Sequence, residues 1–134
     1  MVGRAKEAPP LVLKAITLSP RDPNLGNFYW VIGRAYFVVR DYDNAIVWLR
    51  KSVELATTVW FSRAYLLAAY ALTNRHQQPE AVTTRDDYNS TFASYNLQRI
   101  RNLYATQLPH PDPAMQASIQ ELYRGLQLAG VAER

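Results

Sequence analysis

A spacing of 34 residues between similar side chains constrains the fold of this chain more than any other feature of its sequence. Tyr36 and Tyr70 are 34 positions apart, and the same offset relates Ile32 to Leu66. Both pairs lie within segments whose apolar residues recur about every 3.6 positions, which is the period of an α-helix. A repeat of this length corresponds to a two-helix unit, whose apolar face is buried only when neighbouring units stack on it.

Helix start and stop signals support the same interpretation. Asp22-Pro23 and Asp112-Pro113 each combine an N-cap residue with a proline at the first helical position, and Gly130 is placed to end a helix. We therefore predict an all-α chain of about six or seven helices, over residues 10–18, 24–39, 42–56, 59–74, 79–92, 96–108 and 113–129. The links are short, so successive long helices should form antiparallel pairs.

Gly33 lies in the middle of the predicted helix 24–39, between bulky side chains. A glycine inside a helix costs about 1 kcal/mol relative to alanine. We interpret this cost as the consequence of a second helix that approaches too closely to leave room for a side chain at this position.

From Gly26 onward the sequence resembles the tetratricopeptide repeat (TPR) pattern. The matching residues of the first repeat are Tyr29, Ile32, Gly33, Tyr36, Tyr42, Ala45, Leu49 and Ser52, with Thr57 in place of the final proline. In the second repeat Leu66 and Tyr70 match, Leu67 replaces the glycine, and Ala81 aligns with Ala45 after about two inserted residues. Upstream, Val12, Ala15, Leu18 and Pro20 match the end of a preceding repeat.

The resemblance implies antiparallel helix-turn-helix repeats that form a right-handed superhelix. A partial repeat would cover 11–20, a full one 24–57 and a degenerate one 59–92, followed by a helical extension or cap over 93–134. Residues 1–10 would be an N-terminal tail, and because Ala8-Pro9-Pro10 would break a helix, we expect a non-native or diverged start. The positions that determine the fold would be Gly33, Tyr36, Ala45, Ser52, Tyr70 and Ala81.

In TPR proteins the first helices of successive repeats line a concave groove that binds partners. The residues at such positions that we predict to bind a partner are Trp30, Val31, Arg34, Phe37, Phe61, Tyr65 and Leu72. This set is apolar and lacks the Lys, Asn and Arg residues with which chaperone-binding TPRs hold a C-terminal carboxylate. An apolar groove requires a cover, and the sequence leaves three alternatives for it: the chain's own helix 113–129, a second copy in a homodimer, or another protein.

The end of the chain resembles the C-terminal region of bacterial multidomain signalling proteins, which carry an adenylate/guanylate cyclase-like or a transcriptional-regulator module before their TPRs. The matching residues are Gly125, Leu126, Ala129, Gly130, Val131 and Glu133, with Ala132 in place of a proline. This resemblance implies a non-catalytic interaction or oligomerisation module within a bacterial signalling or regulatory protein.

No residue pattern predicts catalysis, a metal site or a cofactor. Cysteine is absent, and neither His76 nor His110 has a Glu or His at helical ligand spacing. Asp86 and Asp87 are adjacent, so on a helix they would diverge by about 100° and form a poor acid–base pair. The glycines form no phosphate-binding loop. We therefore expect no enzyme activity and no small-molecule substrate.

The net charge of +4 leaves one alternative open, a nucleic-acid-binding regulator that uses Arg99 and Arg101. The arginines are scattered along the chain, whereas nucleic-acid binders usually cluster them on one face. The longest apolar run, residues 65–72, is far shorter than the ~20 residues of a membrane span. We therefore expect no membrane segment and a cytoplasmic location.

Overall fold

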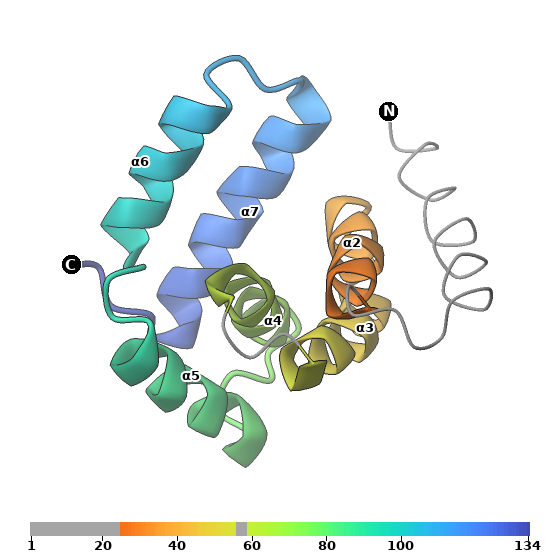
Figure 1. Ribbon diagram of the computed structural model, residues 1–134, viewed down its shortest axis with the longest axis vertical. Helices are drawn as coiled ribbons and strands as arrows, with labels where there is room; N and C mark the ends of the chain where they lie inside the picture. Colours follow the sequence, from red (N-terminus) through yellow and green to blue (C-terminus); the bar gives the residue numbers. More distant parts are fainter. Residues whose placement is uncertain (1–24, 56–58) are drawn as a thin grey trace. The chain divides into compact units, whose positions relative to one another are not determined.

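The computed structural model describes residues 25–55 and 59–134, and this part of the chain is all-α (Figure 1). Its six helices are α2 (Leu25–Val38), α3 (Tyr42–Leu55), α4 (Trp60–Leu72), α5 (Pro79–Thr91), α6 (Leu97–Gln107) and α7 (Pro113–Ala129). Each begins and ends within two residues of a predicted helix, and 79–92 is confirmed as helical. The helix predicted over 10–18, the partial repeat 11–20 and the tail 1–10 lie outside the described residues. None of the described helices combines the length and hydrophobicity that a membrane span requires.

The chain divides into two compact units, Met1–Leu66 and Leu67–Arg134, and the division falls within α4. In the described part of the first unit, α2 and α3 pack along each other. Their shared core consists of fully or nearly fully buried residues: Ile32, Phe37, Ala45, Ile46 and Leu49. At the far end of this pair Ser52 Oγ donates a hydrogen bond to the carbonyl of Gly26 at 2.9 Å and lies 2.8 Å from Ser62 Oγ.

At Gly33 α2 approaches α3 too closely to leave room for a side chain, as predicted from the sequence. A Cβ atom added at Gly33 would lie 2.7 Å from Leu49 Cγ, 2.8 Å from Leu49 Cδ2 and 3.2 Å from the Leu49 backbone nitrogen. Real Cβ atoms do not approach other atoms this closely, and Leu49 is itself completely buried. The glycine therefore serves helix packing.

Helices α2 and α4 end in the same backbone motif, 34 residues apart. Asp41 N–H bonds to Tyr36 C=O at 2.9 Å, and Arg40 N–H bonds to Phe37 C=O at 3.0 Å. At the end of α4, Arg75 N–H bonds to Tyr70 C=O at 2.6 Å, and Asn74 N–H bonds to Ala71 C=O at 3.0 Å. This pair of bonds is the Schellman motif, and it places Arg40 (φ 65°) and Asn74 (φ 64°) in the left-handed region.

The second unit contains the rest of α4 and helices α5, α6 and α7. In this unit α7 packs closely against α4, because a Cβ atom at Gly125 would lie 2.7 Å from Ala68 Cβ and 2.8 Å from Ala68 Cα. The buried side chains Ile119, Leu122 and Leu126 form the core stripe of α7. Asp112 caps α7 by accepting a hydrogen bond from Met115 N–H at 2.8 Å, and Gly130 (φ 92°) ends it.

The segment after α7 accepts hydrogen bonds from the first backbone N–H groups of α6. The backbone N–H groups of Leu97 and Gln98 donate to the carbonyls of Ala132 (2.9 Å) and Glu133 (3.0 Å). Asn96 caps the same helix by accepting from Arg99 N–H at 2.9 Å. From α5, Asn89 holds this segment by donating to Gly130 C=O (3.0 Å) and accepting from Ala132 N–H (3.2 Å). Donors that a helix N-terminus normally exposes are thus satisfied by the chain itself.

Candidate interaction site

Four of the predicted partner-binding residues, all aromatic, form a cluster between α2 and the first half of α4. Two more of the predicted residues, the aliphatic Val31 and the charged Arg34, also lie on α2. Trp30 lies 4.7 Å from Phe61 and 4.8 Å from Tyr65, measured between ring centroids. Phe37 lies 5.0 Å from Tyr65 in an edge-to-face arrangement. Trp30 and Phe37 are two turns apart on α2, and Phe61 and Tyr65 are one turn apart on α4, so each pair occupies one helix face. Pairs in this geometry stabilise by about 0.5–1.5 kcal/mol beyond their buried area.

The burial of the cluster divides the predicted residues into two groups. Phe37 and Tyr65 are each only 1% exposed and belong to the core of their unit. Trp30, Arg34 and Phe61 are partly exposed, and Val31 is 43% exposed. Leu72 is partly exposed near the end of α4, in the second unit. The structure thus joins Trp30 and Phe61 in a partly exposed pair of rings, and Val31, the next residue on α2, has an exposed apolar side chain.

The residues predicted to determine the fold occupy interior positions with one exception. Gly33, Ala45 and Ser52 are buried between α2, α3 and α4, and Ala81 and Tyr70 are 1% and 3% exposed. Tyr36 is only partly buried, and its backbone carbonyl contributes to the end of α2. Small side chains at the closest helix approaches are what ridge-and-groove packing requires.

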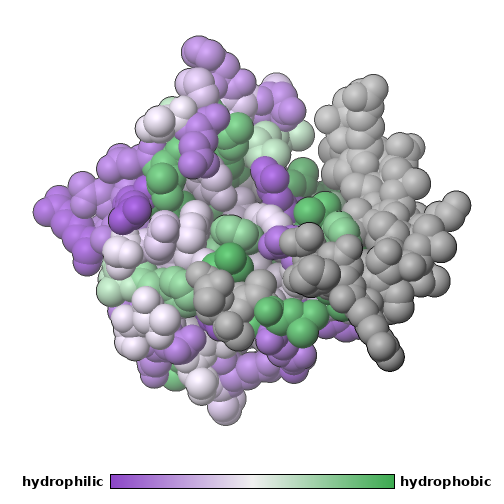
Figure 2. Space-filling view, in the orientation of Figure 1, coloured by the Kyte–Doolittle hydropathy of each residue, from purple (hydrophilic) through white to green (hydrophobic). Residues whose placement is uncertain are grey.

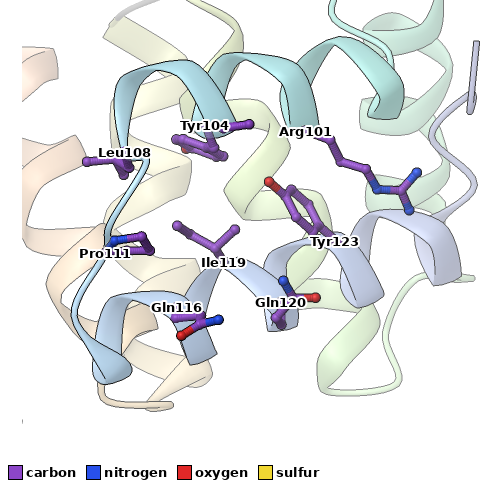
Figure 3. A pocket seen from close by; sticks show the side chains of 9 residues that line it. Arg101, Tyr104, Leu108, Pro111, Gln116, Ile119, Gln120 and Tyr123 are labelled. Atoms are coloured by element: carbon purple, nitrogen blue, oxygen red, sulfur yellow. The ribbon is translucent and has the colours of Figure 1, made fainter.

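A second concave site, between α6 and α7, was not predicted from the sequence. It is a pocket of about 380 Å³ (Figure 3). Its lining residues are Arg101, Tyr104, Ala105, Leu108, Pro111, Gln116, Ile119, Gln120 and Tyr123. On each helix these residues follow the i, i+3, i+4, i+7 pattern of a single face. This spacing is visible in the sequence, but the prediction for residues 93–134 was a helical extension or cap with no pocket of its own. Figure 2 shows hydrophobic residues among hydrophilic ones over α6 and α7.

Arg101 carries the only formal charge among the residues that line this pocket. Its Nη1 forms an ion pair with Glu133 Oε1, and its guanidinium carbon lies 5.5 Å from the centre of the Tyr123 ring. Burial raises the pKa of the Tyr123 phenol, the nearby Tyr104 adds to this shift, and Arg101 opposes it. Tyr123 therefore remains a neutral hydrogen-bond donor at physiological pH.

The arginines considered for nucleic-acid binding are engaged locally. Arg99 is exposed and stacks on the Tyr95 ring at 4.6 Å, whereas Arg101 pairs with Glu133. Elsewhere Arg85 pairs with Asp86 at 2.9 Å and Arg124 with Glu121 at 2.7 Å. Among the described residues no group of three or more His, Cys, Asp or Glu side chains is placed to hold a metal ion.

We also compared the chain with models of known protein families, with curated proteins and with solved structures, and none of these three comparisons found a match.

Proposed function

We propose that this chain is a non-catalytic protein-interaction module of the TPR type. The observation that carries the proposal is the repetition of one backbone motif at a spacing of 34 residues, at the ends of α2 and α4. The close approach of α2 and α3 at Gly33 gives independent support, because the repeat pattern has a small residue at this position. The resemblance of residues 125–133 to the ends of bacterial signalling proteins supports a place in a cytoplasmic protein of that kind.

The proposed partner-binding face combines Trp30, Val31, Arg34 and Phe61. Trp30 and Phe61 contact each other with their ring planes tilted by 47°, so their rings form a rigid apolar surface that loses little conformational entropy on binding. Val31 extends this surface with its exposed side chain, and Arg34 adds a charged group one turn from Trp30. Such a surface suits an apolar segment of a partner protein, and a second copy of the chain is the alternative.

The molar mass of the protein, measured by light scattering over a range of concentrations, separates these two partners. A mass that rises from 15.3 kDa towards twice that value would identify a second copy. A mass that stays at 15.3 kDa would direct the search to another protein, by affinity capture from the source cells.

Val31→Glu tests the proposed face in either case. Val31 is a better choice than Trp30, because replacing Trp30 would also remove its core contacts with Phe61 and Tyr65. The matched control is Val47→Glu on α3, since Val47 is the same residue type with a similar exposed fraction, 48% against 43%. We expect Val31→Glu to weaken association by about tenfold or more, as for a charge buried at an apolar contact. Equal effects of the two substitutions, or no effect of either, would contradict the proposed face.

A further inference from the structure

We propose that α5 and the start of α6 form a recognition site for an extended peptide, and that residues 130–133 of the chain occupy this site as a displaceable strap. The peptide that the site takes has an aliphatic residue at the position of Val131 and an acidic residue at the position of Glu133. This inference goes beyond the proposed partner-binding face, because the strap and its site belong to the second unit, whereas that face belongs to the first.

Asn89 on α5 binds the backbone of the strap through both ends of its side-chain amide. Its Nδ2 donates to the carbonyl of Gly130 at 3.0 Å, and its Oδ1 accepts from the N–H of Ala132 at 3.2 Å. An amide that pairs with a carbonyl and an N–H of one segment fixes the position and the direction of that backbone. Because these bonds use no side chain of the strap, a peptide of another sequence can form them as well.

The first turn of α6 continues this backbone recognition towards the end of the strap. Leu97 N–H donates to the carbonyl of Ala132 at 2.9 Å, and Gln98 N–H donates to the carbonyl of Glu133 at 3.0 Å. Together with the two bonds of Asn89, these bonds engage four backbone groups over four residues of the strap. Main-chain bonds of this kind supply the affinity when a peptide adds a strand to a sheet edge.

Two side chains of the strap give the site its selectivity. Val131 is only 6% exposed, and the carboxylate of Glu133 forms an ion pair with Arg101 of α6. Ala132 lies between them in the sequence and is exposed. Alternate side chains therefore contact the protein, as in other complexes of extended peptides. The pattern that the site selects is an aliphatic residue, a residue of any type except proline, and an acidic residue.

The strap is placed to leave its site while the surrounding helices remain folded. It begins at Gly130 (φ 92°), and glycine gives the backbone the freedom to turn away from the end of α7. Gln98, Ala132 and Glu133 are exposed, so a competing peptide can reach the backbone bonds from solvent. The attached strap has an effective concentration on the order of 1 mM. A partner segment with the same pattern displaces it by binding more tightly than this concentration offsets.

Binding of a labelled peptide tests the site in the full chain. The probe is a fluorescein-labelled, amidated peptide with the sequence of residues 129–134, and the readout is fluorescence anisotropy. Val131→Ser combined with Glu133→Gln removes both selective contacts of the strap and leaves Asn89 and α6 unchanged. For a free-peptide dissociation constant on the order of 0.1 mM, the strap competes about tenfold, so this double variant should bind the probe about tenfold more tightly than the wild-type chain. Equal affinities, or no binding to either chain, would overturn the proposal.

Matched controls locate the bound peptide. In the double variant, Asn89→Ala should reduce binding below detection, whereas Asn102→Ala removes the same side chain type from an exposed position of α6 and should leave binding unchanged. A probe with serine at the position of Val131, or with glutamine at that of Glu133, should bind at least about fivefold more weakly. Equal losses from the two asparagine substitutions, or equal binding of the three probes, would contradict the assigned site.

A titration of the ¹⁵N-labelled wild-type chain decides the question even if the double variant does not fold. An excess of unlabelled peptide, up to about ten times the effective concentration of the strap, should replace the strap in part of the molecules. We expect the backbone amide resonances of Leu97 and Gln98 and the side-chain amide resonances of Asn89 to shift. The absence of shifts at these three residues would overturn the proposal and would leave the partner-binding face of the first unit unaffected.

Discussion

Replacing Gly33 with alanine sets two opposing effects against each other at one position. Alanine should stabilise the helix by about 1 kcal/mol relative to glycine. Against this, the new Cβ would lie 2.7 Å from Leu49 Cγ and 2.8 Å from Leu49 Cδ2. Cγ is close to the backbone, Leu49 is completely buried, and its backbone nitrogen lies 3.2 Å from the same point, so the side chain cannot swing aside. Overpacking of this kind costs about 1–3 kcal/mol. With the clash at the upper end of that range, we expect a net loss of about 2 kcal/mol.

A double-mutant cycle with Leu49→Ala isolates the contact. Leu49→Ala alone should cost about 2–5 kcal/mol through the cavity that it creates. In that background both of the closest Leu49 atoms are gone, and Gly33→Ala should be neutral or stabilising by up to about 1 kcal/mol. The predicted coupling energy is therefore about 2–3 kcal/mol in favour of the double mutant.

Urea unfolding followed by tryptophan fluorescence measures each corner of the cycle. The three tryptophans, Trp30, Trp48 and Trp60, all lie in the first unit, so the signal reports the unit that contains the substituted contact. The reasoning would be refuted if Gly33→Ala stabilised the wild-type chain, or if it cost the same free energy in both backgrounds.

Three further predictions concern the helix contacts and ends. Gly125→Ala should destabilise the second unit more than Gly33→Ala destabilises the first, because the added Cβ would meet the Ala68 backbone at 2.8 Å, which no rotamer change relieves; far-UV circular dichroism during urea unfolding measures this. Arg40→Gly should stabilise the chain by about 0.5–1 kcal/mol, because φ at this position is 65° and glycine adopts such values without strain; a loss in the same unfolding assay would contradict this. Burial raises the pKa of Tyr88, and coupling with Tyr104 and Tyr95 acts in the same direction, so the folded state holds this proton more tightly than the unfolded state. This difference in proton affinity contributes fully to the free energy of unfolding below about pH 10, and the contribution is lost as the pH rises through the folded-state pKa. Tyr88→Phe should therefore reduce the slope with which the free energy of unfolding falls at alkaline pH. An unchanged slope would contradict the assignment.

Much of the helical structure could be predicted because its signals are local. The N-cap and proline at Asp112-Pro113, the stop at Gly130 and the 3.6-residue apolar period act within a turn or two of themselves. The capping role of Asn96 was not predicted, because the predicted helix 96–108 begins at this residue and not after it. The tight packing at Gly33 could be predicted as well, because a glycine destabilises the helix that contains it, and a close contact with a second helix explains its presence.

The predicted partner-binding residues were chosen from repeat positions, and the structure adds which of them face solvent. Periodicity identifies the face of a helix but not what lies opposite, so it could not separate the core residues Phe37 and Tyr65 from the exposed Val31. The pocket between α6 and α7 escaped prediction for the same reason. Its residues follow a core pattern on both helices, and only the angle and spacing of the two helices decide whether such faces meet or leave a space.

By itself the sequence determined an all-α chain, the bounds of its described helices to within two residues, and the need for a close contact at Gly33. These properties depend on interactions between residues that are near one another along the chain. Only the tertiary structure decided that Gly125 meets Ala68, that Glu133 reaches Arg101, and that α6 and α7 line a shared open pocket. Each of these features joins side chains from separate helices or from the end of the chain, and their meeting depends on how whole helices pack, which no local pattern encodes.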